Sequence, residues 1–306
     1  MKHLLIINPA AGVKDSTEKI LEEAKKVFEN CDMEYHVTVS KGDTFPFIKN
    51  YLTSHQDENV RIYSCGGDGT MNDIANGMVG FSNCELAVYP SGSGNDFLKA
   101  FIDKDIFKSL EELKNGDVIS IDLIKAGERY AVNEFNIGFD ANVVVKQAKI
   151  KRWPLVSGKL AYDIGVLSAF LGKIRGNYKI TIDGKVVFEG VGILGAVMNG
   201  GYYGGGYLCA PKAKMNDGLL DLCFIKNLGK MKFLSLLSDY KQGRHLEEDS
   251  KAKPYVVYNQ GKEIRIEIDK EWPYSVDGEI LYTKDITINV VPNAIKVVVP
   301  KNDKLK

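Results

Sequence analysis

The sequence predicts an α/β domain with a doubly wound parallel sheet, followed by a second half built mostly of antiparallel strands. Over roughly the first 120 residues, short β-rich runs alternate with helical patterns, which is typical of parallel sheets covered by helices. From about residue 125, runs such as 179–183 and 263–268 alternate polar and apolar residues with period two. This period is typical of antiparallel strands with one solvated face.

The individual elements of the first half follow from short apolar runs and helix signals. The run at 4–7 stops at Asn8-Pro9, so it is better explained as a buried first strand than as a signal peptide. Asp15 and Ser16 offer caps for a helix that runs to about residue 30. We expect further strands at 35–39, 61–65 and 85–89, further helices at 44–52 and 72–78, and, in the second half, helices at 142–150, 158–171 and 230–240.

Composition narrows the class of protein before any motif is considered. The 306 residues are enough for about two domains, and 40 basic residues balance 40 acidic ones, so no general basic field favours nucleic acid. Five cysteines without a CxxC pair favour a reducing, cytoplasmic compartment over a disulfide framework. No window reaches the ~18 consecutive apolar residues of a membrane span, so any contact with a bilayer is expected at its surface.

Two segments rich in small residues follow predicted strands directly. Asn8-Pro9-Ala10-Ala11-Gly12 comes after the first strand, and Gly66-Gly67-Asp68-Gly69-Thr70 comes after the strand at 61–65. Taken alone, the first is better explained as an Asn-Pro turn. The second is sharper, because three glycines at a strand-to-helix junction let backbone N–H groups approach a polyphosphate. We therefore expect phosphate binding at 66–70, with Asp68 available to orient a metal ion or a nucleophile.

A third loop of this kind, Pro90-Ser91-Gly92-Ser93-Gly94-Asn95-Asp96-Phe97, follows the next strand. An ordinary capped loop is the alternative, with Asn95 or Asp96 as the cap of a following helix. Ligands of parallel sheets lie beyond the carboxyl ends of the strands, and all three loops are predicted at that edge. We expect an active site there, in a cleft between the two halves of the chain.

Three later Asp-Gly pairs need separate interpretations, because Asp-Gly is also a common hairpin turn. Asp183-Gly184 is expected to be only a turn. Asp217-Gly218 is either a bare turn or a site at which hard oxygen ligands hold Mg²⁺ or Ca²⁺. Asp277-Gly278-Glu279 places two carboxylates close together, which suits proton abstraction from an alcohol, although a plain hairpin is favoured on local pattern alone.

A local basic patch follows the Gly138-Phe139-Asp140-Ala141 segment. Five cations and no acid lie between residues 141 and 162, with Trp153, Pro154 and Leu155 among them. Such a patch can rest on anionic lipid head groups, whereas a solvated helix face is the simpler explanation. The cations are Lys146, Lys149, Lys151, Arg152 and Lys159.

Taken together and in order, these motifs resemble those of the bacterial diacylglycerol kinase catalytic-domain family, soluble lipid kinases related to sphingosine kinases and NAD kinases. The resemblance spans nearly the whole chain. The motif at 66–70 is shared with NAD kinases, so the later motifs carry the family assignment. They are the segments at 90–97 and 138–141, Asn216-Asp217-Gly218, and Asp277-Gly278-Glu279.

The resemblance implies an ATP-binding α/β domain at 1–124, an antiparallel β-sandwich at 125–290, and a return of 291–306 to the first domain. In this NAD kinase/diacylglycerol kinase-like fold, the first two loops hold the ATP phosphates, and Thr38 and Ser93 are further contacts. The implied ATP-binding residues are Asn8, Pro9, Ala10, Ala11, Gly12, Thr38, Gly66, Gly67, Asp68, Gly69, Thr70, Met71, Asn72 and Ser93.

The same resemblance implies the metal and catalytic residues. A structural Mg²⁺, or Ca²⁺ in its place, would be held by the Asp217 side chain and by the carbonyls of Lys214 and Leu219. Asn216 stands where the family often has an aspartate, which removes one charge from this turn. Glu279 is the expected general base, Asp277 is the other candidate, and Asp68 would orient a catalytic Mg²⁺.

The implied reaction moves the γ-phosphate of ATP to the hydroxyl of a lipid, with diacylglycerol giving phosphatidic acid. A cytoplasmic protein in peripheral contact with an anionic membrane is expected, with no nucleic-acid partner and with a homodimer allowed. The alternatives are an NAD kinase, which Asn133-Glu134 favours, a kinase of phosphatidylglycerol or another lipid, and a catalytically silent lipid or nucleotide sensor. The acids at 68, 217, 277 and 279 argue against a silent protein.

Overall fold

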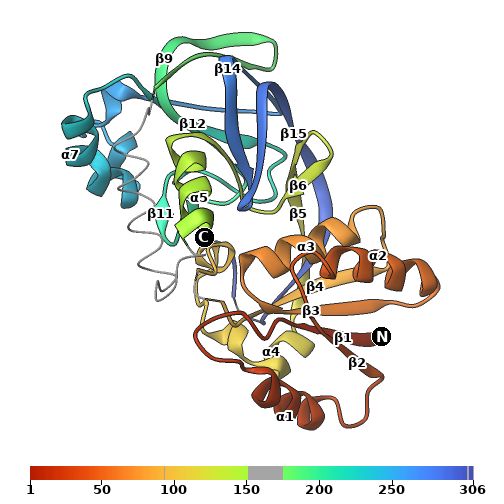
Figure 1. Cartoon of the computed structure of the whole chain (residues 1–306). Helices are drawn as coiled ribbons and strands as arrows, with labels where there is room; N and C mark the ends of the chain where they lie inside the picture. The colour runs from red at the N-terminus through yellow and green to blue at the C-terminus, as the bar shows by residue number, and fades with distance from the viewer. Residues whose placement is uncertain (93, 151–174, 302, 306) are drawn as a thin grey trace.

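The computed structural model describes residues 1–92, 94–150, 175–301 and 303–305. Its two halves lie one above the other in Figure 1, with a helix-covered parallel sheet below and a strand-rich half above. The elements of the first half are β1 (Lys2–Ile7), α1 (Thr17–Val27), β2 (Met33–Val37), α2 (Thr44–Ser54), β3 (Val60–Gly66), α3 (Asp68–Met78), β4 (Cys84–Pro90), the 3₁₀ turns η1 (Phe97–Ala100) and η2 (Ile106–Lys108), and α4 (Leu110–Lys114).

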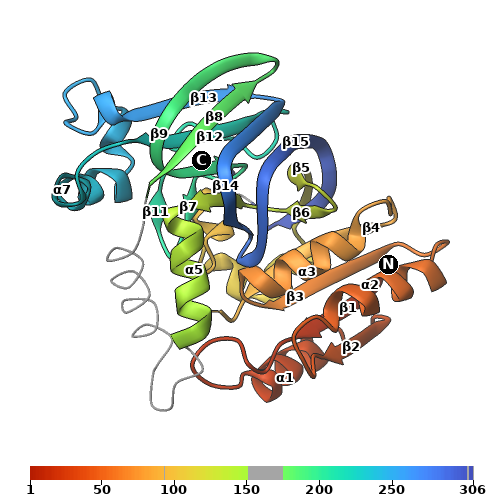
Figure 2. The same cartoon turned by 45° about the horizontal axis from the view of Figure 1, so that its top comes forward.

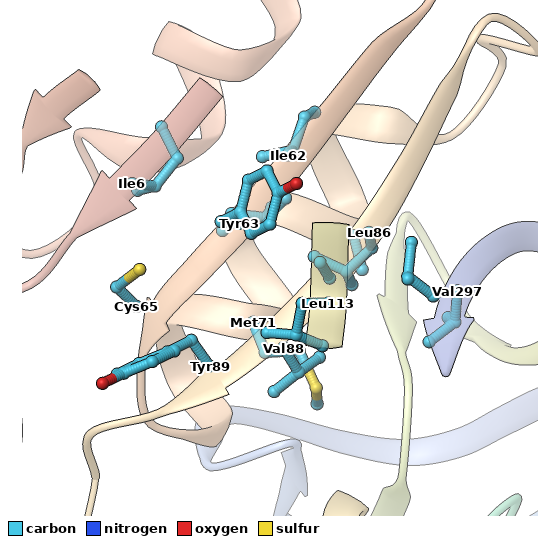
Figure 3. Close-up of a cluster of buried hydrophobic side chains, with 14 of the residues drawn as sticks. Ile6, Ile62, Tyr63, Cys65, Met71, Leu86, Val88, Tyr89, Leu113 and Val297 are labelled. Atoms are coloured by element: carbon cyan, nitrogen blue, oxygen red, sulfur yellow. The ribbon is translucent and has the colours of Figure 1, made fainter. Parts of the chain in front are cut away.

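The sheet of the first half has the order β2-β1-β3-β4, and all of these pairs are parallel. Every residue of β3 is buried, as expected for a parallel strand covered on both faces. Helices α2 and α3 cover one face and α1 and α4 the other (Figure 1). In Figure 3, Ile62 of β3 and Leu86 of β4 belong to the same apolar cluster as Met71 of α3 and Leu113 of α4.

The second half is built of antiparallel strands, with helices packed at its outside (Figure 2). Strand β8 pairs with both β9 and β14, and alternating residues of β8 are buried, which confirms the period-two prediction. The elements are β5 (Asp117–Ala126), β6 (Arg129–Ala131), β7 (Glu134–Gly138), α5 (Phe139–Ile150), β8 (Gly176–Ile182), β9 (Lys185–Met198), β10 (Tyr202–Tyr203), β11 (Tyr207–Leu208), β12 (Leu220–Lys226), α7 (Lys230–Lys241), η3 (Arg244–Leu246), η4 (Lys253–Tyr255), β13 (Val256–Gly261), β14 (Glu263–Val276) and β15 (Glu279–Val299).

Strand β15 joins the two halves. It starts at a hairpin with β14, runs antiparallel to β5, and ends parallel to β4 through Val297 and Val298. Val297 lies in the apolar cluster of the first half (Figure 3). The domain limits expected at residues 124 and 290 therefore fall inside β5 and β15, strands that serve both halves, and these limits stay predictions.

Several elements differ in extent from the sequence-based expectation. Helix α3 begins at Asp68 rather than near residue 72, because Gly67 already occupies the N-cap position. The helix expected after Asp96 is the short 3₁₀ turn η1. The helix expected at 158–171 lies outside the described residues. Within the described ranges, no helix is both long and apolar enough to cross a bilayer.

Candidate active site between the glycine loops and the Asp-Gly-Glu turn

The three small-residue loops predicted at the carboxyl edge of the sheet are bonded to one another. The Asn8 side-chain amide donates to the Thr70 hydroxyl at 2.9 Å. The backbone N–H groups of Ser91 and Gly92 both donate to the Gly66 carbonyl, at 2.9 and 3.0 Å. The structure thus brings the ends of β1, β3 and β4 to one place.

Glycine is required at two of these contacts by space and backbone angle. A Cβ atom on Gly92 would lie 2.5 Å from the Cα of Gly67, and one on Gly12 would lie 2.5 Å from the Ser91 carbonyl oxygen. Gly12 also has a φ of +80°, which side-chain-bearing residues rarely adopt. Larger residues at either position would push the loops apart.

Helix α3 starts at this junction, so its first backbone N–H groups and the positive end of its dipole face the loops. Thr38 lies beside the first loop, because its N–H donates to the Ile7 carbonyl at 2.9 Å. Met71 is buried in the core, and its N–H donates to the Gly67 carbonyl at 3.1 Å. Ser93 lies outside the described residues.

Acidic groups gather next to these loops. Burial, with the neighbouring Asp96 charge, raises the pKa of Asp68 above its ordinary value. Asp96 is itself buried, pairs with Lys99, and accepts a hydrogen bond from the Gly205 N–H at 2.7 Å. The last contact ties the glycine-rich segment at 200–206, in the second half, to the first half.

Asp277 forms the centre of a backbone clamp at the β14–β15 turn. Its carboxylate accepts hydrogen bonds from the backbone N–H groups of Val132 at 2.7 Å, Glu134 at 2.8 Å and Asn133 at 3.3 Å. Burial raises the pKa of Asp277 to about 7, although these three donors act in the opposite direction. The carboxylate is therefore committed mainly to holding residues 132–134.

Asn72 connects helix α3 to this clamp. With its amide nitrogen facing the acceptors around it, Asn72 donates to Asp277 Oδ2 at 3.0 Å and to the Tyr130 carbonyl at 3.1 Å. Since α3 begins at the glycine loops, this contact brings the Asp-Gly-Glu turn to the predicted phosphate site across the two halves.

Glu279 follows the clamp and is half-buried. Its carboxylate Oε1 lies 2.8 Å from the ammonium of Lys41, and 32% of its side chain is exposed. Asp73 on α3 is a close electrostatic neighbour: burial, and then the charge of Glu279, raises the pKa of Asp73. Neither Lys41 nor Asp73 belongs to a motif that the sequence singled out.

The predicted metal turn lies at the surface. Asp217 is exposed, and its Oδ1 accepts a hydrogen bond from the Leu219 N–H at 3.0 Å. The buried Asp122 holds this turn, because its Oδ2 accepts from the Gly218 N–H at 2.7 Å and its Oδ1 from the Asn293 N–H at 2.8 Å. Sequence reasoning missed Asp122, although an acid between the apolar Ile121 and Leu123 was a usable signal.

The carboxylate oxygens near the glycine loops suit a magnesium ion that takes most of its ligands from water and phosphate. No three His, Cys, Asp or Glu side chains in the described ranges are grouped closely enough to hold a metal by themselves. Mg²⁺ in nucleotide sites usually keeps waters and phosphate oxygens and uses one or two carboxylates. The charge repulsion between Asp68 and Asp96 fits such an ion. The metal role expected for Asp217 with the carbonyls of Lys214 and Leu219 stays a prediction.

Most of the expected basic patch and the helix expected at 158–171 lie outside the described residues. Of the basic patch, only Lys146 has a described side chain. The remaining patch residues, and the apolar residues of the helix expected at 158–171, lie outside the described residues or have side chains that are not described. They are Lys149, Lys151, Arg152, Trp153, Pro154, Leu155, Lys159, Leu160, Val166, Leu167, Phe170 and Leu171.

The glycine loops at a helix N-terminus and the antiparallel second half define a phosphate-transferring enzyme of the NAD kinase/diacylglycerol kinase-like fold. The family model of the diacylglycerol kinase catalytic domain matches residues 2–126. The model of the YegS C-terminal NAD kinase beta sandwich-like domain matches residues 133–299. The chain therefore belongs to the YegS and diacylglycerol kinase family, and it is a lipid kinase, an enzyme class that uses ATP and usually a divalent metal.

Relatives with the same organisation cover most of the chain. The "Probable lipid kinase YegS-like" of Shewanella frigidimarina is 31% identical over 258 residues, which are 82% of this chain and 81% of that one. The diacylglycerol kinase of Bacillus subtilis is 26% identical, over 90% and 88% of the two chains. A crystal structure of a diacylglycerol kinase from Bacillus anthracis superimposes with a TM-score of 0.72 at 24% identity, over 98% and 97%, which shows a shared fold.

Proposed function

We propose that this lipid kinase phosphorylates diacylglycerol, with ATP bound at the three glycine loops and Glu279 as the general base. The contact between Asn72 and Asp277 carries the proposal, because it joins the helix that starts at the glycine loops to the turn that bears Glu279. The name of the Bacillus subtilis relative supports the choice of acceptor.

The roles of the two carboxylates follow from their surroundings. Asp277 accepts three backbone hydrogen bonds, so its oxygens face the backbone of residues 132–134 rather than an acceptor hydroxyl. Glu279 is exposed on one side and has only one oxygen engaged in the ion pair. We therefore assign proton abstraction to Glu279 and assign Asp277 to positioning.

The chain's own groups provide binding and orientation. The loop at 66–70 binds the ATP phosphates through backbone N–H groups at the start of α3, and the loop at 8–12, Thr38 and Ser93 provide further ATP contacts, so that the γ-phosphate faces the acceptor hydroxyl. Glu279 then accepts the hydroxyl proton as the alcohol oxygen attacks phosphorus and ADP leaves. Asp68 would contribute one ligand to Mg²⁺, which neutralises negative charge on the phosphates when it is bound. A second, structural ion would be held at Asp217, Lys214 and Leu219.

The backbone of the Asn133-Glu134 pair has a role in this arrangement that needs no dinucleotide. Both backbone N–H groups hold Asp277, and the Asn133 side chain donates to the Tyr202 carbonyl. These contacts give the backbone of the pair a structural role, and the NAD reaction of the test below decides whether its side chains meet a dinucleotide. Peripheral membrane contact, a cytoplasmic location and a homodimer remain predictions.

The test is transfer of labelled γ-phosphate from MgATP in three parallel reactions. One offers diacylglycerol in mixed micelles with phosphatidylglycerol, one offers phosphatidylglycerol alone, and one offers NAD in buffer; Glu279→Gln serves as the matched inactive enzyme. We expect labelled phosphatidic acid from the wild type only. Label on phosphatidylglycerol alone would change the acceptor, label on NAD would replace the proposal, and micelle binding without any label would point to a silent sensor.

A further inference from the structure

Lys41 lies outside every motif discussed above, yet it contacts the proposed base. Its ammonium is 2.8 Å from Glu279 Oε1, although 82% of the Lys41 side chain is exposed. Lys41 belongs to the loop between β2 and α2 in the first half, whereas Glu279 starts β15 at the second-half hairpin. The ion pair therefore crosses from the ATP-binding half to the residue proposed to accept the proton.

The loop that carries Lys41 is anchored on both sides. The Thr38 N–H donates to the Ile7 carbonyl at 2.9 Å, one residue before the Asn8 loop. The Val39 N–H donates to Asp43 Oδ2 at 2.7 Å, and Asp43 is the N-cap residue of α2. Because these bonds fix the backbone on both sides of Lys41, the origin of its side chain is fixed relative to the first proposed ATP loop.

The charges around this pair explain why a cation is needed there. Asp73 of α3 and Glu279 repel each other, and the Lys41 ammonium offsets that repulsion at Asp73, as Arg129 also does. A carboxylate has two oxygens and can accept several hydrogen bonds. With Lys41 at Oε1, the Oε2 atom of Glu279 remains available to an acceptor hydroxyl.

We propose that Lys41 is a positioning residue for Glu279: it holds Oε1 so that Oε2 accepts the proton of the lipid hydroxyl. This inference rests on the proposed function, because it assumes that Glu279 is the base. Exposed ion pairs contribute little to folding stability, so Lys41 is expected to act on catalysis rather than on the fold. It also links the base to the loop that holds Thr38.

The experiment is a double-mutant cycle on phosphate transfer from MgATP to diacylglycerol in mixed micelles. It compares wild type with Lys41→Met, Glu279→Gln and the double variant, and it includes Lys41→Arg. The matched control is Lys49→Met, because Lys49 is an exposed lysine of neighbouring α2 that lies 5.8 Å from the centre of the Phe45 ring. Thermal melting verifies that each variant is folded.

We expect Lys41→Met to lower kcat about 10-fold with an unchanged KM for ATP, since a misplaced base slows the chemical step more than binding. Lys41→Arg should retain most of the activity, and Lys49→Met should equal wild type. In the Glu279→Gln background, Lys41→Met should cause no further loss, because the two residues act as one unit.

Four results would overturn the inference. Lys41→Met with wild-type kcat would show that the ion pair does not orient the base. Independent, multiplicative losses in the double variant, or a raised KM for ATP, would show that Lys41 acts on another group, such as a phosphate. If Glu279→Gln itself keeps full activity, Glu279 is not the base and Lys41 cannot position it. This result distinguishes a failure of the proposed function from a failure of the Lys41 inference alone.

Discussion

Two Asp-Gly turns of the second half, at Asp183 and at Asp277, have nearly the same local structure. Both aspartates have positive φ, 47° and 43°, and each is followed by a glycine with positive φ. Each aspartate N–H donates at 3.0 Å to the carbonyl of a glutamate, Glu263 or Glu134, whose own N–H donates back to the aspartate carboxylate. The Asp-Gly pattern therefore builds the same clamp in both places.

The two turns differ in what surrounds the clamp. Asp183 is exposed and holds Lys262 and Glu263 at the edge of the second half. Asp277 is half-buried, contacts Asn72 of α3, and lies close enough to Asp68 for that charge to raise its pKa. The residue after the glycine is Lys185 in one turn and Glu279 in the other. The comparison teaches that the aspartate is a structural acceptor in either turn, so chemistry at 277–279 is better assigned to Glu279.

Replacing the residue after the glycine should give the largest difference in kcat between the two turns. Glu279→Gln removes the proposed base and is expected to lower kcat about 10³-fold, within the range known for general-base catalysis. Lys185→Gln, the same position in the other turn, should leave kcat unchanged. Steady-state transfer of labelled phosphate to diacylglycerol measures both. Equal activity of the two variants would place the base elsewhere.

Replacing the two clamp aspartates should lower stability in both turns but lower kcat in only one of them. Asp277→Asn and Asp183→Asn each replace an acceptor oxygen with an amide that faces backbone donors, which costs about 1–3 kcal/mol for a buried group and less for an exposed one. Urea unfolding should show the larger loss for Asp277→Asn. Only that variant should also lower kcat, about 10-fold, because residues 132–134 and Glu279 shift together. A normal kcat in a folded Asp277→Asn protein would contradict the positioning role.

The stability of the Asp277 clamp should also depend on pH. Its pKa is about 7 in the folded protein and ~3.9 in an unfolded chain, so the folded state binds this proton more tightly. Its stabilising contribution is complete below the unfolded value and is lost as pH rises through about 7. The stability deficit of Asp277→Asn should therefore shrink between pH 5 and pH 8, by roughly 2–3 kcal/mol. A deficit that grows over this range would refute the raised pKa.

Replacing the glycine of each turn should have the smallest effect on stability, and the effect should be nearly the same in both turns. Gly184 and Gly278 have φ values of +79° and +87°, and a Cβ at either position would meet no atom within 4 Å. Each Gly→Ala change should cost about 1 kcal/mol from backbone strain alone. Equal decreases in melting temperature would support the shared clamp; a much larger decrease for Gly278→Ala would reveal packing at the Asp277 turn that the Asp183 turn does not have.

Much of the fold could be predicted from local patterns. The apolar runs at 4–7, 61–65 and 85–89 and the period-two runs at 179–183 and 263–268 correspond to β1, β3, β4, β8 and β14. The predictions that failed concern where elements begin and how long they are. Helix α3 begins four residues before the predicted start, with Gly67 as its N-cap, and the short turn η1 replaces the helix expected after Asp96. Local periodicity does not contain the interactions that end an element.

The candidate site was predictable only in its local parts. The loops at 8–12, 66–70 and 90–97 carry their small residues in sequence, so their chemistry could be inferred. The contacts of Asp122, Lys41 and Asn72 could not be predicted this way, because their partners Gly218, Glu279 and Asp277 lie 96, 238 and 205 positions away along the chain. Such pairings appear only once β5, β15 and α3 are packed.

The sequence by itself determined the alternation of strands and helices, the glycine loops that tolerate close approach, and the three Asp-Gly turns, because each depends on neighbours a few residues away. Only the tertiary structure decided that the Asp277 turn meets α3 while the Asp183 turn faces solvent, and that β15 returns to β4. Burial and long-range hydrogen bonds make that distinction, since they depend on which surfaces are removed from water together when the two halves pack.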